Sequence, residues 1–297
     1  MEIRVLQYFL AIAREETISG AAEFLHITQP TLSRQMKDLE DELGKTLFIR
    51  GTRKIELTEE GMILRKRAEE IIALVDKTEM EISTSDQHIS GDIYIGCGET
   101  EGMRIIMKVI KKIQKQHPFI KFHIESDYKA DVIDKLNKGL IDFGVLVNTG
   151  KMNNYNYLEL PYKDVCGVLM RKDSPLSSKN FITVEDLKDK PLILSRQDMQ
   201  SDNIATWLNE DMNEMNVVAT YNLIYNASLM VEEGIGYVIG LDRLINTSNT
   251  DLCFKPLSPS LEVGLSVVWK KYQVFNKASK YFMTTLQSEI ESIIKKD

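Results

Sequence analysis

Residues 27–39 read ITQPTLSRQMKDL, and this stretch decides how the first part of the chain folds. Thr28 is placed to cap a helix, and Pro30 falls in its first turn, where the missing N–H of proline does no harm. Leu32, Met36 and Leu39 recur at helical spacing, which predicts one face turned toward a core. The other face carries polar and basic side chains, namely Gln29, Thr31, Ser33, Arg34, Gln35 and Lys37. Such a face suits the base edges and phosphates of a DNA major groove.

The preceding residues predict a partner helix. Ser19 is placed to cap a helix over residues 19–25, in which Ala21 and Ala22 are small enough for close helix contact. His26 and Ile27 then leave only a tight connection to the next helix. This arrangement is typical of a helix-turn-helix. Such helix pairs also occur in proteins that never bind DNA, so the pair alone leaves that alternative open.

A hairpin follows these helices. We expect the three helices to span residues 2–14, 19–25 and 27–43, with Gly44 as the left-handed cap of the third. Residues 47–49 and 55–57 alternate as two short strands around a turn at Gly51, which completes a winged helix-turn-helix. The predicted wing tip carries three basic residues that are placed to reach DNA phosphates or the minor groove: Arg50, Arg53 and Lys54. The alternative is a solvated charged hairpin.

A long helix begins after Thr58, its predicted cap, with Glu59 and Glu60 at its positive end. Apolar and small residues step along it by four and three, which predicts a dimerisation seam. The seam consists of Leu64, Ala68, Ile71, Val75, Thr78 and Ile82. Packing of this stripe against its own chain is the alternative. Residues 83–91 break the pattern and predict a hinge.

Composition limits the class of protein. The chain has 297 residues, 43% hydrophobic and 27% charged, which predicts two or three globular units. No apolar run is long enough for a membrane span, and acidic residues near the N-terminus make a poor signal peptide, so we expect a cytoplasmic protein. The net charge of −7 means that any DNA contact depends on local basic residues and is sensitive to salt. The three cysteines lack zinc-type spacing and predict reduced thiols.

Residues 92–297 alternate between strand and helix patterns. The order over residues 92–147 is βαβαβ, which implies a parallel sheet with right-handed crossovers. A second series begins near Val165, and the chain crosses back near residues 263–269 before a final helix over residues 276–294. Segments 162–166 and 265–269 are the expected hinge between two lobes. Two-lobed α/β units bind small molecules in the cleft between the lobes.

Residues 1–90 resemble the DNA-binding region of LysR-type transcriptional regulators. The resemblance rests on AAEFLHITQPTLSRQMKDLEDELGKTLFIR, on LTEEG and on the long helix that follows. The remaining chain is similar to the effector domain of that family by pattern. The resemblance implies an α/β protein with a winged helix-turn-helix (1–58), a linker and dimerisation helix with its hinge (59–90) and a periplasmic-binding-protein-like effector domain (91–297). We expect its first lobe to span about 91–163 and 267–297, and its second about 164–266.

The same resemblance implies a regulator whose promoter binding or DNA bending responds to a small-molecule effector. It implies a dimer that assembles into a tetramer, with double-stranded promoter DNA, the effector and RNA polymerase as partners. DNA contact is expected from the exposed residues of the helix-turn-helix and the wing. These are Ser19, Thr28, Gln29, Pro30, Thr31, Ser33, Arg34, Lys37, Arg50, Arg53 and Lys54.

Candidate effector residues follow the carboxyl ends of predicted strands. They are Glu99, Thr100, Glu101, Tyr128, Lys129, Arg196 and Asn226. Related regulators often place Ser or Thr after the first strand to hold a ligand carboxylate, and Thr100 matches that role by resemblance. Glu99 and Glu101 depart from the pattern, either repelling a carboxylate or capping a helix outside the site. Lys129 and Arg196 are candidate counter-charges for an anion, with solvated surface cations as the alternative.

The sequence lacks a catalytic constellation. Its four histidines are scattered without metal-ligand spacing, and it contains no phosphate-binding loop of the GxxxxGK type. We therefore expect no enzyme, no metal and no cofactor other than the effector. A solute-binding protein, a cleft enzyme and an oxidant-sensing pair of Cys97 and Cys166 are the disfavoured alternatives.

Overall fold

The computed structural model describes the chain except for residues 52–53, 84–88, 148–151, 197–201, 209–214 and 296–297. It consists of two compact units, Met1–Thr84 and Ser85–Asp297, which we call the N-terminal and C-terminal units. None of the helices in the described part of the chain has the length and apolar character needed to cross a membrane.

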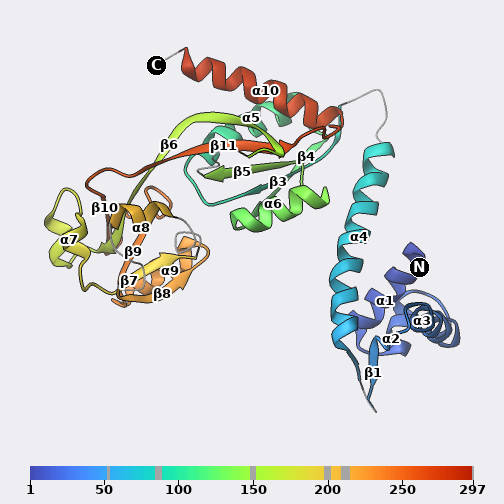
Figure 1. The fold of residues 1–297 in the computed structure, drawn as a ribbon. Coiled ribbons are helices and arrows are strands. Elements are labelled where there is room, and N and C mark those ends of the chain that lie inside the picture. Colours follow the sequence, from blue (N-terminus) through green and yellow to red (C-terminus); the bar gives the residue numbers. More distant parts are fainter. Residues whose placement is uncertain (52–53, 84–88, 148–151, 197–201, 209–214, 296–297) are drawn as a thin grey trace. The chain divides into compact units, whose positions relative to one another are not determined.

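The N-terminal unit is the predicted winged helix-turn-helix (Figure 1). A two-stranded antiparallel wing follows three helices and leads into one long helix. The elements are α1 (Ile3–Glu15), α2 (Ile18–Phe24), α3 (Gln29–Leu43), β1 (Phe48–Arg50), β2 (Ile55–Leu57) and α4 (Glu59–Ser83).

Side chains and glycine fix the helix ends in this unit. Thr28 caps α3 by accepting the N–H of Thr31, and Gly44 ends it at φ 64°, both as predicted. The prediction for α2 was wrong by two residues, because the cap is Thr17 and not Ser19. The Thr17 hydroxyl accepts the N–H of Gly20 at 3.1 Å, which starts the helix earlier and leaves Ser19 exposed within it.

The first half of α4 belongs to the core of its own unit. Ala68 has an exposed fraction of 0%, and Leu64 and Ile72 pack partly buried against the core formed by α1–α3. Ala68 is therefore not available to a second subunit, which corrects that part of the predicted seam. Ile71 has an exposed fraction of 38% and Val75 is half-buried, so dimerisation through the later turns stays a prediction.

The C-terminal unit is built on one mixed sheet in the strand order β4-β3-β5-β11-β6-β9-β7-β8, with β10 paired to β6. Its first lobe has the predicted parallel strands, with β3 paired to both β4 and β5. The elements are β3 (Gly91–Cys97), α5 (Met103–Gln116), β4 (Ile120–Ser126), α6 (Lys129–Lys138), β5 (Phe143–Val147) and α10 (Lys277–Ile294).

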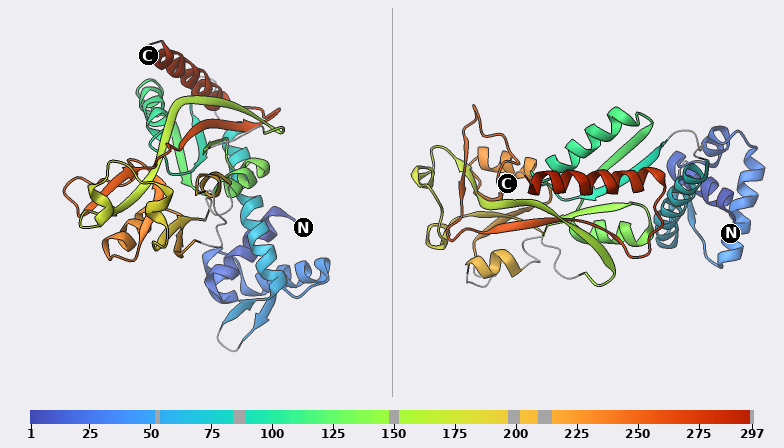
Figure 2. Two further views of the ribbon diagram at one scale, coloured as in Figure 1. Left: turned by 60° about the vertical axis from the view of Figure 1, so that its left-hand side comes forward. Right: turned by 90° about the horizontal axis from the view of Figure 1, so that it is seen from above.

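Both faces of the first lobe's sheet are covered. Helices α5 and α10 lie on one face, where Ile106, Phe143 and Phe282 are fully buried in a shared core. Helix α6 covers the other face through Val132 and Leu136 (Figures 1 and 2). This two-sided cover explains the continuous apolar run of β5, whereas the edge strand β4 alternates polar and apolar residues and is largely exposed.

The second lobe is likewise a sheet with helices packed on both faces. Strand β7 pairs in parallel with β8 and β9, between a core that includes α7 and α8 and another that includes α9. The elements are the 3-10 helix Pro175–Ser178, α7 (Val184–Leu187), β7 (Leu192–Ser195), α8 (Asp202–Leu208), β8 (Val217–Tyr221), α9 (Ile224–Glu232), β9 (Tyr237–Leu241) and β10 (Leu252–Pro256).

Two long antiparallel strands join the lobes, β6 (Tyr155–Arg171) and β11 (Glu262–Lys270). Their register shifts between Gly264 and Leu265, where the chain returns to the first lobe. From Leu265 onward β11 also pairs with β5. The structure thus places the second crossing slightly before the expected segment 265–269.

Candidate functional site

The outer face of α3 is open to solvent. Gln29, Thr31, Arg34 and Lys37 are exposed, as are Thr28 and Pro30, whereas Ser33 is half-buried. The side chain of Arg34 has an exposed fraction of 84%, and its Nε lies 4.0 Å from the Asp38 carboxylate. The opposite side of the same helix buries Leu32, Met36 and Leu39 against the core. The buried side thus fixes the helix in the core, and most of the polar side chains on its outer face are open to solvent.

The base of the wing is tied to the end of α1. Lys54 forms an ion pair with Glu16, and this hydrogen bond raises the pKa of Lys54. The Ile55 N–H donates to the Glu16 carbonyl at 2.7 Å. Lys54 is thus a wing cation that already has an acidic partner. Arg53 and the side chain of Arg50 lie outside the described residues.

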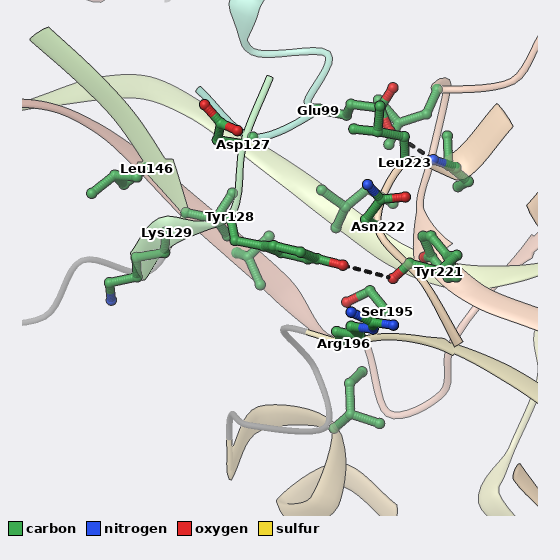
Figure 3. Close-up of a pocket in the computed structure, with 18 of the residues that line it drawn as sticks. Glu99, Asp127, Tyr128, Lys129, Leu146, Ser195, Arg196, Tyr221, Asn222 and Leu223 are labelled. Atoms are coloured by element: carbon green, nitrogen blue, oxygen red, sulfur yellow. Dashed lines mark hydrogen bonds between the residues drawn. The ribbon is translucent and has the colours of Figure 1, made fainter. Parts of the chain in front are cut away.

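A cavity of about 850 Å³ lies between the lobes of the C-terminal unit (Figure 3). Its lining comes from loops after β3, β4, β7 and β8, the strand ends at which the sequence predicted a site. Four of the predicted effector residues line it, namely Glu99, Tyr128, Lys129 and Arg196. Most of the other lining side chains are apolar, among them Ile133, Leu146, Ile204, Leu223, Leu241 and Leu261.

Three predicted effector residues do not line the cavity. Thr100 is buried and donates a hydrogen bond to Asp164, while its hydroxyl accepts the N–H of Gly102 at 3.0 Å. Glu101 pairs with Arg104 one helical turn away. Asn226 is exposed within α9, because that helix begins at Ile224, earlier than the sequence predicted.

Two hydrogen bonds cross the cavity from one lobe to the other. The Glu99 carboxylate accepts the backbone N–H of Ile224 at 2.7 Å. The Tyr128 hydroxyl donates to the carbonyl of Tyr221 at 3.4 Å (Figure 3). Sequence reasoning missed Tyr221 and Asn222, although both stand at the carboxyl end of β8, the position that signals a site.

The acidic groups and thiols around the cavity have defined surroundings. Lys135 binds the Asp127 carboxylate at 2.6 Å and the Glu125 carboxylate at 2.5 Å. Cys97 is buried, and burial raises the pKa of its thiol to about 11, with a further increase from Asp127 and Glu99. Such a thiol is protonated at neutral pH and therefore a poor nucleophile, which weakens the oxidant-sensing alternative.

Metal-ligating side chains do not gather elsewhere in the described residues. No group of three or more His, Cys, Asp or Glu is arranged there to hold a metal ion. His123 pairs with Asp92 on the sheet edge at 2.8 Å, and His117 packs edge-on against Tyr281.

Comparison with known proteins places both units. Residues 3–62 match the family described as bacterial regulatory helix-turn-helix protein, lysR family, and residues 86–291 match the LysR substrate binding domain. The transcriptional regulator BsdA of Bacillus subtilis (strain 168) is 32% identical over 198 residues, which cover 66% of this chain and 67% of BsdA. The Hca operon transcriptional activator HcaR of Escherichia coli (strain K12) is 25% identical over 99% of both chains.

The fold is also that of solved full-length regulators. The crystal structure of CbnR, a LysR family transcriptional regulator, matches with a TM-score of 0.75 at 18% identity, over 98% of this chain and 99% of CbnR. A full-length OxyR variant from Pseudomonas aeruginosa matches with a TM-score of 0.58 at 22% identity, over 98% of this chain and 99% of that chain. With both units matched by the family, this chain belongs to the LysR family of transcriptional regulators, which are DNA-binding proteins and not enzymes.

Proposed function

We propose that this regulator inserts α3 into the major groove of promoter DNA and responds to a small molecule held in the cavity. The exposed polar face of α3, fixed by the buried Leu32, Met36 and Leu39, is the observation that supports the DNA part. Gln29 and Thr31, at the helix N-terminus, meet base edges, and Arg34 reaches a guanine edge or a phosphate. Lys37 and Lys54 contact phosphates.

Support for DNA binding through the N-terminal unit also comes from a structural neighbour. CbnR has been crystallised with its target DNA, and that structure matches this chain with a TM-score of 0.75 at 18% identity, over 97% of this chain. At such identity the likeness concerns the fold, so the contacting residues named above are proposals for this chain alone.

Two copies act together in this proposal. The later turns of α4 expose Ile71, Leu74 and Ile82, large apolar side chains that a second α4 would cover. Dimers present two α3 helices to two half-sites, and pairs of dimers form the tetramer that bends DNA. A cytoplasmic location and contact with RNA polymerase complete the proposed setting.

The cavity supplies the regulatory input. Its walls come from both lobes, so a bound molecule favours one lobe arrangement over another if its affinity for the two differs. The resulting shift in population passes to the subunit arrangement and hence to the affinity for DNA.

The first test is a gel shift of the purified full chain on DNA upstream of its own gene and of the divergent neighbour. A salt series and a scrambled fragment of equal length serve as controls. We expect saturable retention of the upstream fragment, with an affinity that falls steeply as salt rises. Equal retention of both fragments at every salt concentration would contradict sequence-specific binding.

A further inference from the structure

A carboxylate of the first lobe caps a helix of the second lobe across the cavity. Ile224 is the first residue of α9, and the preceding Leu223 has no side-chain group that could cap the helix. The Glu99 carboxylate supplies this cap by accepting the Ile224 N–H at 2.7 Å. Figure 3 shows this bond at the end of the cavity where Glu99 and Leu223 meet.

Because Glu99 occupies the N-terminus of α9, this helix end is not open to an anionic ligand. The N-terminus of a helix favours negative charge, because its backbone N–H groups lack partners and the helix dipole is positive there. Here a carboxylate of the chain itself takes that place. A ligand carboxylate at this end would lie close to Glu99, and like charges a few ångströms apart in a partly desolvated site repel strongly.

The other charges around the cavity do not offset Glu99 at this end. Asp127 and Asp131 are further acidic groups on the lining, and Lys135 already binds Asp127 at 2.6 Å. In Figure 3 the Lys129 side chain points away from Tyr128 and Asn222. Arg196 is exposed, so solvent screens its charge. The Glu99 end is therefore acidic, and apolar side chains line most of the remaining wall.

We infer that the effector is a small, largely apolar molecule whose polar head donates a hydrogen bond and carries no negative charge. Glu99 accepts this bond, since a carboxylate has capacity for several donors beyond the Ile224 N–H. The amide of Asn222, which Figure 3 shows between Glu99 and Tyr128, binds the same head. The inference rests on the proposed function, namely that the cavity is the effector site.

Three probes that share one ring test this inference on the purified full chain: benzylamine, benzyl alcohol and benzoate. Their dissociation constants are measured by ligand-observed NMR. We expect benzylamine or benzyl alcohol to bind at least about tenfold more tightly than benzoate, a difference of roughly 1.4 kcal/mol. Preference for benzylamine identifies a cationic head, and equal binding of benzylamine and benzyl alcohol identifies a neutral donor as sufficient.

Variants assign the preference to Glu99. Glu99→Gln keeps the side-chain size and a hydrogen-bond acceptor while removing the charge. Benzoate should therefore bind several-fold more tightly to this variant, and benzylamine should bind more weakly. Glu101→Gln is the matched control, because Glu101 is an adjacent acid that does not line the cavity. Glu101→Gln should leave the order of the three probe affinities unchanged. Tightest binding of benzoate to the wild type, or an order that Glu99→Gln does not alter, would overturn the inference.

A blocked cavity separates this inference from the proposed function. Gly98 lines the cavity, and a Cβ at this position would have no neighbour within 4 Å, so Gly98→Leu places its side chain in open space. Loss of probe binding in Gly98→Leu locates the probes in the cavity. Binding that survives this change, or no binding of any probe to the wild type, contradicts both proposals. Binding in the cavity with benzoate preferred contradicts only the inference about ligand charge.

Discussion

The outer face of α3 and the cavity between the lobes, the two proposed binding sites, are built in opposite ways. The α3 face is convex and exposed, and its polar residues lie within ten positions of sequence, from Thr28 to Lys37. The cavity is concave, and the residues bonded across it are 125 and 93 positions apart. The first surface is complete on one helix, whereas the second exists only while two lobes keep their arrangement. Changes on α3 should therefore act locally, and changes at the cavity should act on the lobes.

The largest effect on operator affinity should come from breaking the proposed dimer, which separates one α3 helix from the α3 helix of the second copy. Ile71→Asp places a charge in the exposed part of α4, where the exposed fraction is 38%. If dimers form there, operator affinity should fall roughly 10²- to 10⁴-fold, because the two α3 helices are no longer linked. Light scattering should report a lower mass together with an unchanged circular dichroism spectrum. An unchanged mass would remove these turns of α4 from the dimer interface.

Ala68→Asp is the comparison for Ile71→Asp within the same helix. Ala68 is fully buried in the core of the N-terminal unit, so this charge is unpaired and desolvated. The expected outcome is unfolding of the N-terminal unit and not a folded monomer. Equal behaviour of the two variants would contradict the division of α4 into a core half and an exposed half.

Arg34→Ala tests the α3 face on its own. The Arg34 side chain is exposed and pairs only loosely with the exposed Asp38, so thermal stability should stay nearly unchanged. Loss of an arginine contact to a base edge costs about 1–3 kcal/mol, so specific DNA affinity should fall roughly 5- to 150-fold. Arg65→Ala, at an exposed ion pair with Glu69 on α4, is the matched loss of one positive charge. A gel shift in which both variants bind equally would place base recognition elsewhere.

The difference between the two surfaces also explains what the sequence could predict. Caps at Thr28 and Gly44, the apolar spacing in α3 and the βαβαβ order are local signals, and the structure confirms each of them. The strand ends of the cavity were predictable by the same logic, because open α/β sheets place ligands there.

Which side chains enter the cavity was less predictable. Thr100 turns inward because its hydroxyl donates a hydrogen bond to Asp164, 64 positions later, on the strand that joins the lobes. Asn226 faces solvent because Glu99 caps α9 from the other lobe and fixes its start at Ile224. Both outcomes depend on partners distant in sequence. Ala68 shows the same limit, since heptad spacing does not distinguish a partner helix from the chain's own α1.

Asp164 makes the C-terminal unit sensitive to pH in a way that the α3 face is not. Its exposed fraction is 1%, and no carboxylate in the described residues of the N-terminal unit is buried. Burial raises the pKa of Asp164, aided by the negative charges of Glu101 and Asp242 and opposed by the hydrogen bond from Thr100. Because the folded pKa is the higher one, protonation stabilises the fold below the unfolded pKa, and this stability is lost as pH rises through the folded pKa.

Asp164→Asn should remove this pH dependence of the stability of the C-terminal unit. The stability of the variant relative to wild type should increase as pH rises from the ordinary carboxyl range toward neutrality, measured by urea unfolding at a series of pH values. Asp134→Asn, at a solvent-exposed carboxylate on α6 that pairs with Lys138, controls for the loss of one negative charge. A stability difference that stays constant with pH for Asp164→Asn would show that this carboxyl is not the titrating group.

The smallest effect should come from the weaker of the two bonds across the cavity. Tyr128→Phe removes a hydroxyl that donates to the Tyr221 carbonyl at 3.4 Å, near the limit for a hydrogen bond. Such a bond contributes about 1 kcal/mol or less, so affinity for a cavity-bound probe should change by no more than about fivefold. Tyr225→Phe, on the exposed side of α9, is the matched control, and DNA affinity without ligand should be equal in both variants. A loss of probe affinity far beyond fivefold would mean that Tyr128 itself binds the ligand. Binding in the cavity would then depend on a single side chain, as DNA binding by α3 is expected to depend on Arg34.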